Sequence, residues 1–478
     1  MTQWRLGIDL GTSALKLVVL DGEGCVRGES GSAYPTVSNT PGQAEQDPQH
    51  WLRALRQAIA ALPGDCVSRI GAISVAGQMP TLVCLDAHGH SIGPAITWQD
   101  GRADAMAAER LKDGLHATVY ARTGMPVDGR YLAPQFLHHF RDRRGDVKRI
   151  LSAKDYLVHA LTGRAVTDPS TAAGYGVYAL ETESWDADLC DIWDLPMSLL
   201  PVLLPTTMVA GTVLPASASD FSLPVGIPVY TGAADSAAGA YAMTGLNANS
   251  ASIAMGSSAI IFGATPASHL DPKSRYLLTP HVSAGWYGRE MDLLSTGIGF
   301  AWLGRMFGLT TEALEVEALT SPPGARGVTC APYMTGGGEQ GALWDTSLTG
   351  VFHGLSVASS RADLARAYLE GVIFEVRRCL DVLSETWPVR QVMLSGRLSR
   401  NPALVQMFAD GSGRSVQVFG YESSAAIGAA ALAGEPLAVR LPDATVYRPG
   451  AAAAFHERAY AGFLSRYPVI ARRGPEAI

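Results

Sequence analysis

The sequence lacks the signatures of disulfide scaffolds, zinc modules and P-loop proteins. Its 6 cysteines are spread singly along 478 residues. No Cys-x-x-Cys pair occurs, so we expect reduced thiols rather than a disulfide framework or a zinc knuckle. No Gly-x-x-x-x-Gly-Lys-Ser/Thr motif occurs either, which excludes a P-loop.

Charge is also sparse, at 17% of residues, with a net charge of -7 and a hydrophobic content of 47%. An acidic chain without a basic tract is a poor general nucleic-acid binder. No apolar run approaches the roughly 18 residues that span a bilayer. The first ten residues carry Arg5 and Asp9 instead of an apolar signal core, so we expect a cytoplasmic protein. The length predicts two or three domains.

Two hairpins with one sequence plan open the two halves of the chain. Apolar strands within residues 6–20 and 250–263 are each interrupted by a glycine-hydroxyl turn, Gly11-Thr12-Ser13 and Gly256-Ser257-Ser258. The repetition predicts a duplicated architecture. Chance similarity of two Gly-Ser turns is the alternative.

Helices and strands alternate through the rest of the sequence, which indicates the α/β class. Asp47-Pro48 is typical of a helix start, and residues 70–75 form an apolar strand. Further helices are expected after Ser360 and from Asn401-Pro402. Residues 196–228 are rich in Pro, Ser and Gly, and this composition predicts loops.

The first turn has the composition of an oxyanion-binding loop. Gly11 lets backbone N–H groups approach a phosphate, and Thr12 and Ser13 can donate further hydrogen bonds. Asp9 ends the preceding strand, where its carboxylate could hold magnesium directly or through water. A plain tight turn with Asp9 bonded to local N–H groups is the alternative. Lys16 either reaches a phosphate or lies on an edge strand.

Asp235 stands where a strand ends and a helix begins. The position suits a helix N-cap, and it also suits a general base that accepts the proton of an attacking hydroxyl. Gln78-Met79 ends another strand, and Trp98, Asp100 and Arg102 follow downstream. An amide, an acid and a guanidinium beside an aromatic face suit a polyhydroxylated ligand. A core tryptophan with a surface turn is the alternative.

In their order along the chain, these motifs resemble those of the FGGY carbohydrate kinases. Residues 7–16 are similar to the family's first phosphate loop. Further matches, from about residue 5 to residue 435, are Gly77-Gln78-Met79, Trp98-x-Asp100-Gly101-Arg102, Gly232 to Gly239, Leu369-Glu370-Gly371 and Glu422 to Ala430. The joint order makes the resemblance specific, and within the family xylulokinases are the most similar.

The resemblance implies a two-lobed, actin-like (ribonuclease H-like) α/β ATPase fold with a duplicated core and a cleft between the lobes. The implied lobes are residues 1–243, with the sugar site and the catalytic aspartate, and residues 244–445, with the nucleotide site. Residues 446–478 form a tail that we expect to pack on the first lobe. ATP and Mg²⁺ are the implied cofactors and a sugar the implied partner. No nucleic acid or membrane is expected, and a homodimer is allowed.

The same resemblance assigns roles to individual residues. Asp235 is the implied catalytic base, and Asp9 and Asp235 are the implied magnesium ligands. The residues expected around ATP are Gly11, Thr12, Ser13, Lys16, Gly256, Ser257, Gly297, Gly299, Gly396, Arg397 and Asn401. Those expected beside the sugar are Gln78, Met79, Trp98, Asp100 and Tyr131.

The implied reaction is ATP-dependent phosphorylation of a primary hydroxyl of a small ketose, D-xylulose to D-xylulose 5-phosphate, in xylose metabolism. One departure bears on the sugar. Xylulokinases read Gly-Gln-Met-His-Gly, whereas here Gln78-Met79 continues into Pro80-Thr81, so a sugar-contacting histidine is missing. A kinase for another ketose or an alditol, such as ribulose or an erythritol-type polyol, is the first alternative. A non-catalytic nucleotide-dependent sensor is the second, and Asp235 argues against it.

Overall fold

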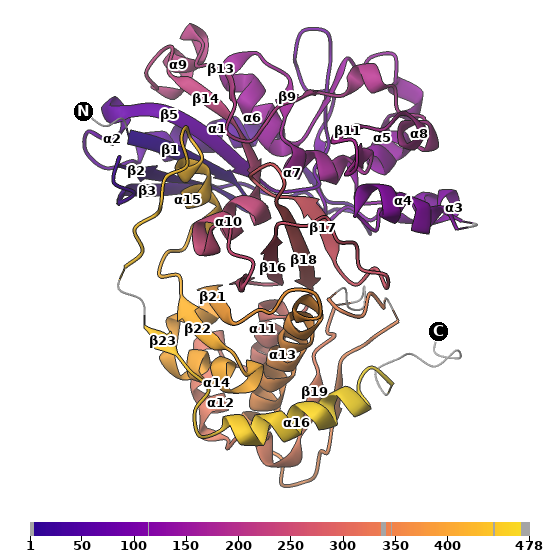
Figure 1. Cartoon of the computed structure of the whole chain (residues 1–478), viewed down its shortest axis with the longest axis vertical. Helices are drawn as coiled ribbons and strands as arrows, with labels where there is room; N and C mark the ends of the chain where they lie inside the picture. The colour runs from indigo at the N-terminus through magenta and orange to yellow at the C-terminus, as the bar shows by residue number, and fades with distance from the viewer. Residues whose placement is uncertain (1–3, 113, 336–340, 346, 443–444, 470–478) are drawn as a thin grey trace. The chain divides into compact units, whose positions relative to one another are not determined.

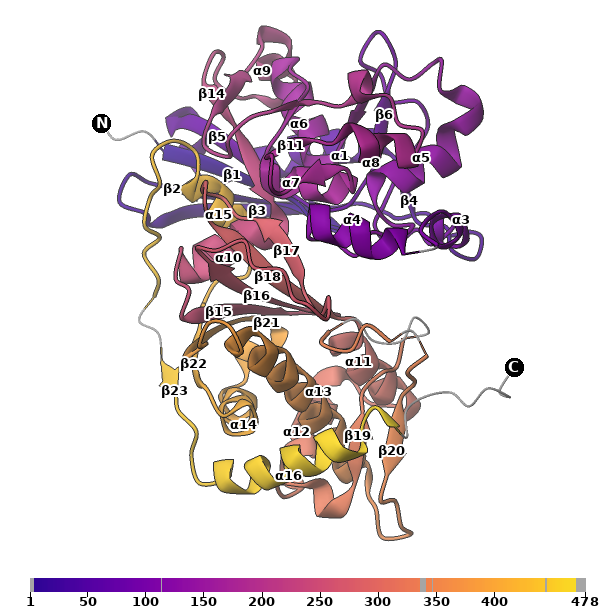
Figure 2. The ribbon, with the colours of Figure 1, turned by 45° about the vertical axis from the view of Figure 1, so that its right-hand side comes forward.

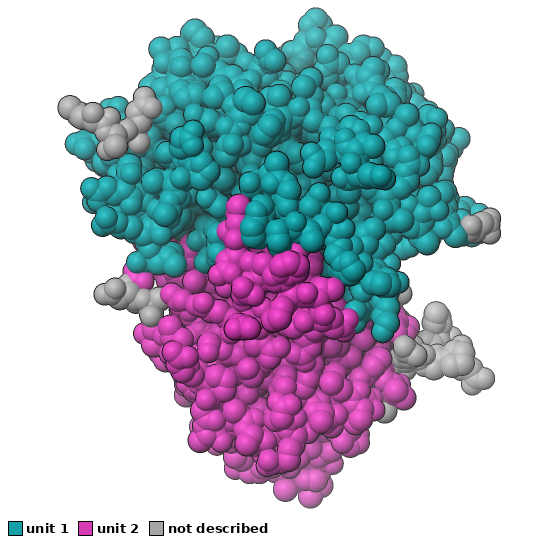
Figure 3. Space-filling view, in the orientation of Figure 1, with its two compact units in different colours: residues 1–245, 266–288, 423–441 teal, residues 246–265, 289–422, 442–478 magenta. Residues whose placement is uncertain are grey.

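The computed structural model describes residues 4–469 except 113, 336–340, 346 and 443–444. The chain divides into two units (Figures 1 and 3). The first unit comprises residues 1–245, 266–288 and 423–441, and the second comprises residues 246–265, 289–422 and 442–478. Among the described residues, no helix is both long and apolar enough to cross a membrane.

A six-stranded mixed sheet with strand order β13-β14-β5-β1-β2-β3 forms the centre of the first unit. The strands are β1 (Trp4–Leu10), β2 (Ala14–Leu20), β3 (Val26–Ala33), β5 (Ile70–Gly77), β13 (Val209–Thr212) and β14 (Pro228–Ala234). β5 runs parallel to both β1 and β14, whereas β1, β2 and β3 form an antiparallel meander. Every residue of β5 is buried, as expected for a parallel strand covered on both faces.

Alternation along β1 assigns its two faces to different helices (Figures 1 and 2). Leu6, Ile8 and Leu10 share one apolar cluster with residues of α1 (Pro48–Ala60) and α6 (Ala153–Thr162). Gly7 points the opposite way, because side chains alternate along a strand. A Cβ at Gly7 would lie 1.9 Å from the Ala426 carbonyl of α15 (Ser424–Ala431). α15 in turn packs on α10 (Asp235–Thr244).

Shorter elements complete the first unit. Its other helices are α2 (Cys66–Arg69), α3 (Asp104–Arg110), α4 (Leu115–Thr123), α5 (Leu132–Phe140), α7 (Pro169–Ala172), α8 (Ala187–Ile192) and α9 (Pro215–Phe221). Its paired short strands are β4 (Glu45–Gln46) with β7 (Ala95–Ile96), β6 (Val83–Leu85) with β8 (Arg149–Leu151), β9 (Val166–Thr167) with β12 (Val202–Leu203), and β10 (Tyr178–Ala179) with β11 (Ser184–Trp185). The strand β17 (Leu277–Pro280) lies within residues 266–288 of this unit.

The loop prediction for residues 196–228 is wrong in part. β13 pairs antiparallel with β14, and α9 packs on α1 and α6. β14 is the strand that follows α9, whereas α1 and α6 come from distant parts of the chain. Together these contacts outweigh the local preference of Pro, Ser and Gly for turns.

The second unit repeats the strand plan of the first. Its strands follow the order β18-β16-β15-β21-β22-β23. They are β15 (Ser250–Met255), β16 (Ala259–Thr265), β18 (Tyr287–Leu293), β21 (Gln391–Gly396), β22 (Ser415–Val418) and β23 (Val446–Tyr447). β15 forms an antiparallel hairpin with β16 and is parallel to β21, as β1 is with β2 and β5. The duplication predicted from the two hairpins is confirmed.

Helices and one further hairpin complete the second unit. The helices are α11 (Gly297–Met306), α12 (Thr311–Thr320), α13 (Arg361–Ser384), α14 (Pro402–Ser412) and α16 (Ala453–Arg466), and β19 (Thr329–Ala331) pairs with β20 (Val351–His353). Ser360 and Asp363 form a capping box at the start of α13. The expected packing of the tail on the first lobe is wrong. α16 contacts α13 and α14, and its Tyr460 and Phe463 bury their rings against Phe374.

Candidate active site

Three neighbouring parallel strands of the first unit end at polar residues. Asp9 lies at the end of β1, Gln78 directly follows β5, and Asp235 directly follows β14. The parallel registers of β1 with β5 and of β5 with β14 bring these three ends level. Ligands of open α/β sheets bind outside the carboxyl ends of the strands. This edge is therefore the candidate site of the first unit.

Asp235 is the first residue of α10 and is partly buried. The N-cap prediction for Asp235 is wrong by one position, because Ala234 has extended dihedral angles (φ -56°, ψ 146°) and takes the cap position. The Asp235 Oδ1 atom accepts the Ser236 N–H at 2.9 Å. A carboxylate in the first turn of a helix is stabilised by the helix dipole, which favours the ionised form that a general base needs.

Asp9 is buried, and its Oδ1 atom has no hydrogen-bond partner among the described residues. The alternative of a turn closed by Asp9 through this atom is not seen, because the Gly11 N–H donates to the Ala14 carbonyl. Burial raises the pKa of Asp9 to about 6, although the charge of Lys16 opposes the shift. Lys16 lies opposite Asp9 on β2. β2 is flanked by β1 and β3, so the edge-strand alternative for Lys16 is wrong.

The raised pKa of Asp9 predicts a pH-dependent difference in stability. An unfolded aspartate has a pKa of ~3.9, whereas burial raises the pKa of folded Asp9 to about 6. Between these values the folded state holds a proton that the unfolded state has lost, so the contribution of Asp9 to stability falls as pH rises through this window. We expect the free energy of unfolding of Asp9→Asn, relative to the unmodified protein, to rise by up to about 3 kcal/mol across it.

Denaturation midpoints with urea, measured without Mg²⁺ on both sides of the window, test this expectation. Asp220→Asn serves as the control, because Asp220 is exposed in the same unit. A difference between Asp9→Asn and the unmodified protein that stays constant with pH would contradict the assignment.

Gln46 connects the first turn to Gln78. Its Nε2 atom donates to the Thr12 carbonyl at 2.7 Å, and its Oε1 atom accepts from Gln78 Nε2 and Trp51 Nε1, each at 3.0 Å. Trp98 Nε1 donates to Thr12 Oγ1 at 3.0 Å. An indole N–H only donates, so Thr12 accepts this bond and its own hydroxyl proton can serve another acceptor. Sequence reasoning missed Gln46, which lies beside the helix cap and belongs to no motif.

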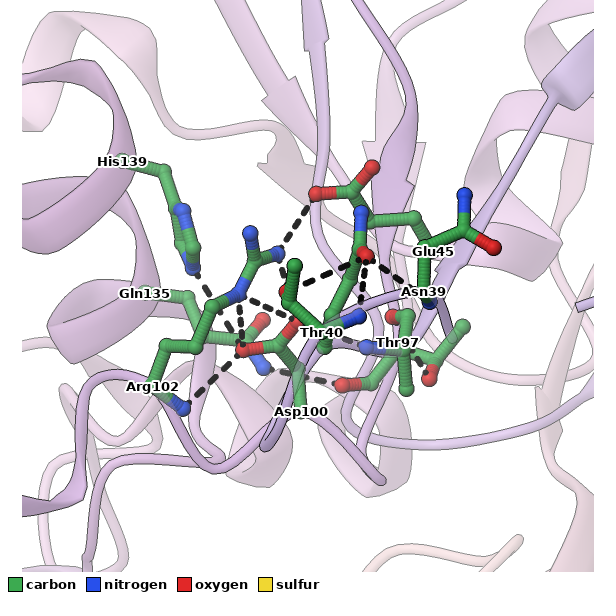
Figure 4. A network of polar contacts seen from close by, with 10 residues as sticks. Asn39, Thr40, Glu45, Thr97, Asp100, Arg102, Gln135 and His139 are labelled. Carbon is green, nitrogen blue, oxygen red and sulfur yellow. Dashed lines mark hydrogen bonds and ion pairs between the residues drawn. The ribbon is translucent and has the colours of Figure 1, made fainter. Parts of the chain in front are cut away.

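Asp100 is fully buried and its carboxylate is held by protein donors (Figure 4). It accepts from the Ala44 N–H at 2.9 Å and from the Arg102 guanidinium at 2.6 Å, and Arg102 also pairs with Glu45. Burial alone would raise the pKa of Asp100, but the bonds from Arg102 and Ala44 hold it below its usual range. His139 Nε2 lies 3.7 Å from Asp100 Oδ1. Asp100 thus fixes the loop around it.

The other expected sugar-side residues differ in exposure. Met79 and Trp98 are partly buried, and Met79 packs so closely on Gly174 that a Cβ there would lie 2.4 Å from Met79 Cγ. Tyr131 is buried and is the residue before α5. Of the turn residues, Ser13 is exposed, whereas Gly11 and Thr12 are partly buried.

A cavity of about 360 Å³ lies within the second unit. Its wall includes Gly256 and Ser257 of the second turn, Gly297 at the start of α11, Tyr368 of α13 and Arg397. The turn and α11 are joined, because Gly297 N–H donates to the Gly256 carbonyl at 3.1 Å. Largely apolar walls with a few polar groups are typical of small-molecule and cofactor sites.

Gly299 and Gly396 lie against residues of this wall, whereas Arg397 and Asn401 pair with protein groups. A Cβ at Gly299 would lie 2.1 Å from the Tyr368 hydroxyl, and one at Gly396, whose φ is +93°, would lie 2.1 Å from the Met255 carbonyl. Arg397 pairs with Glu312 and Glu315 of α12, each at 3.0 Å. Asn401 caps α14 by accepting the Ala403 N–H at 3.1 Å.

The residues present fit a nucleotide and a magnesium ion that is held mainly by phosphate and water. The orphaned, buried Asp9 Oδ1 is the kind of oxygen that a hard cation binds. No cluster of three or more His, Cys, Asp or Glu side chains able to hold a metal occurs in the described part of the chain. Mg²⁺ is commonly bound through one or two carboxylates together with substrate phosphates, which suits a single acid at this position.

Comparisons with known proteins cover almost the whole chain. Residues 4–242 match the model of the FGGY family of carbohydrate kinases, N-terminal domain, and residues 251–435 match that of its C-terminal domain. The chain is 30% identical over 416 residues to a xylulose kinase of Lactococcus lactis, covering 85% of this chain and 82% of the relative. A glycerol kinase of Gloeobacter violaceus is 28% identical over 441 residues, covering 90% and 87%.

Solved structures share the fold. The crystal structure of xylulose kinase from Rhodospirillum rubrum superposes with a TM-score of 0.87 at 28% identity, over 98% of this chain and 99% of that chain. The two-domain α/β fold of the ribonuclease H-like class, expected from the sequence, is confirmed.

Proposed function

The chain belongs to the FGGY family of carbohydrate kinases and is a sugar kinase, and we propose that it transfers the γ-phosphate of ATP to a primary hydroxyl of D-xylulose. The observation that supports this chemistry is the position of Asp235, directly after β14, where the ends of β1, β5 and β14 lie level. The relatives named xylulose kinases favour the ketose. Glycerol kinases and a gluconokinase are also similar, so the identity of the sugar is the finer part of the proposal.

In the proposed mechanism, Asp235 accepts the proton of the attacking hydroxyl as the oxygen bonds to the γ-phosphorus of ATP and the bond from that phosphorus to the ADP oxygen breaks. Phosphoryl transfer needs little covalent help from a protein, so positioning and charge neutralisation dominate. Gln78 and Trp98 would orient the sugar, and Thr12 would donate its hydroxyl proton to a phosphate oxygen. Asp100 would support this site indirectly, because its carboxylate is held by Arg102 and Ala44.

Asp9 and Asp235 are the proposed magnesium ligands, directly or through water. Mg²⁺ bound with ATP would neutralise charge on the phosphates. At the pH of the cytoplasm Asp9, with a pKa of about 6, is largely ionised, as a cation ligand must be. Lys16, opposite Asp9 on β2, would add a second positive charge near the first turn.

In the second unit we propose that the 360 Å³ cavity binds the nucleotide. The Gly256-Ser257 turn would face the phosphates, and the apolar wall that includes Leu369 would face the base. Gly396, which has a positive φ, permits the close approach of β21 to β15 at the cavity.

Release of ADP from ATP·Mg²⁺ with a panel of pentuloses, hexuloses and alditols, each against a blank without sugar, tests the function. We expect the largest kcat/KM with D-xylulose. A larger kcat/KM with another ketose or an alditol would keep the kinase chemistry and make Pro80-Thr81 the change in specificity. Tight binding of ATP and sugar without turnover would favour the nucleotide-dependent sensor. The cytoplasmic location and a homodimer stay predictions.

A further inference from the structure

A cluster of buried charged side chains lies against the end of β14 in the first unit. Lys154 of α6 pairs with Asp155 at 2.6 Å and with Asp168 at 3.1 Å, and all three side chains are at most 1% exposed. Burial alone would lower the pKa of Lys154, but the two carboxylates outweigh burial and raise it. We call Lys154, Asp155, Asp168 and the adjoining Ser170 the Lys154 cluster. None of these residues belongs to the chemistry described above.

The Lys154 cluster is hydrogen-bonded to β14 at two points. Lys154 Nζ donates to the Thr231 carbonyl at 3.0 Å, and Ser170 Oγ accepts the Ala234 N–H at 3.0 Å. The Ser170 hydroxyl donates its own proton to Asp168, and the Ser170 N–H donates to the same carboxylate. A carboxylate can only accept, so the direction of the Ser170 proton is fixed and a lone pair is left for Ala234.

The segment of β14 that the Lys154 cluster binds is irregular. The pairing of β14 with β5 shifts register between Tyr230 and Ala233. Gly232 has a φ of +79°, and a Cβ there would lie 1.8 Å from the Val75 carbonyl. Bulges of this kind commonly re-aim a side chain beside an active site. Asp235 follows two residues after this irregularity, beyond Ala233 and Ala234, so the direction of its side chain depends on how Thr231 and Ala234 are held.

We propose that the Lys154 cluster is a positioning device for Asp235, in which Lys154 fixes the irregular turn of β14 and Ser170 fixes the peptide before the catalytic carboxylate. The inference rests on the proposed role of Asp235 as the base. The cluster neither touches the sugar nor exchanges a proton with it. The charge of Lys154 compensates Asp155 and Asp168, since buried carboxylates without a partner would be costly. The Ser170 hydroxyl, held by Asp168, then fixes β14 through its hydrogen bond from the Ala234 N–H.

Ser170→Ala is the direct test, because it removes one hydroxyl and leaves the ion pairs in place. We expect kcat to fall by roughly ten- to a hundredfold, since small displacements of a reacting group have effects of this size. The KM for ATP should change by less than about twofold, because Ser170 lies in the first unit and the proposed nucleotide cavity lies in the second. Ser170→Thr keeps the hydroxyl and should restore most of kcat.

Ser217→Ala is the matched control. Ser217 is also a buried serine of the first unit, and its hydroxyl donates to the Ala160 carbonyl at 2.8 Å, which is not part of β14. It should lose a similar amount of stability and retain kcat. If Ser170→Ala does not fold, Ser170→Cys replaces it, because a thiol is a weaker hydrogen-bonding group of similar shape. We then expect a kcat between those of the unmodified protein and a fully impaired enzyme.

The decisive measurement repeats Ser170→Ala in an Asp235→Asn background, under single-turnover conditions at high enzyme concentration. A residue that acts through Asp235 should have no further effect there, to within about twofold, because residues acting as a unit are non-additive. An equal fall of the single-turnover rate constant in both backgrounds would overturn the inference. An unchanged kcat for Ser170→Ala, with Asp235→Asn inactive, would also overturn it and leave the proposed function intact. An active Asp235→Asn would overturn the proposed base itself.

Discussion

Asp235→Asn should abolish most turnover while leaving the fold and ATP binding intact. A single general base contributes roughly 10²–10⁴ to the rate, so we expect kcat to fall by that factor. Asparagine has the same shape and can still accept the Ser236 N–H that Asp235 Oδ1 accepts at 2.9 Å, but it cannot take a proton from a hydroxyl. The proposed nucleotide cavity lies in the second unit, so we expect the Kd of ATP to change by no more than about a few-fold.

ADP release with saturating D-xylulose measures the loss of kcat, and calorimetric titration with ATP measures binding. Asp220→Asn makes the same chemical change at an exposed carboxylate of the first unit and should behave like the unmodified protein. An Asp235→Asn variant that keeps about half of the original kcat would contradict the assignment of Asp235 as the general base, because loss of a general base reduces turnover by orders of magnitude.

Gly428→Ala should strongly destabilise the core of the first unit. Gly428 lies in α15, where a Cβ would stand 1.9 Å from the Ala238 carbonyl of α10. The obstacle is backbone, so no rotamer change relieves it, and α10 must move. Overpacking of this kind costs about 1–3 kcal/mol and occasionally more. Since α10 begins at Asp235, we expect kcat to fall together with the melting temperature.

Thermal denaturation and the ADP-release assay measure the two effects together. Gly462→Ala is the matched control, because it makes the same substitution inside a helix, α16, where no atom lies within 4 Å of the added Cβ. It should be neutral or stabilise by up to about 1 kcal/mol, since alanine has the higher helix propensity. Equal melting temperatures for Gly428→Ala and the unmodified protein would contradict the close packing of α15 on α10.

Local chemistry made several features predictable. Asp47 and Pro48 begin α1, and Ser360 caps α13, because caps depend on neighbouring residues. The two glycine-hydroxyl turns predicted the duplicated strand plan. The order of short motifs indicated the family, which the family models confirm.

Partners that are distant in the sequence were not predictable. Gln46 holds Thr12 and Gln78, and Ser170 holds the peptide before Asp235, yet no local pattern marks either residue. Residues 196–228 have a loop-like composition, but α1 and α6 supply the surface on which α9 packs. Hydrogen bonds between distant segments depend on which backbones the fold brings together, and propensity does not encode this.

The sequence by itself determined the α/β class, the duplication and the sugar-kinase family, and it named the acidic residues proposed for the chemistry. Only the tertiary structure decided which hydrogen-bond donors surround each of these carboxylates. Asp9 is buried with an orphaned oxygen, whereas Asp100 is buried and fully held by Arg102 and Ala44. Both are aspartates that the sequence motifs single out. They differ because the cost of burying a carboxylate depends on the donors that surround it, and the fold alone supplies those donors.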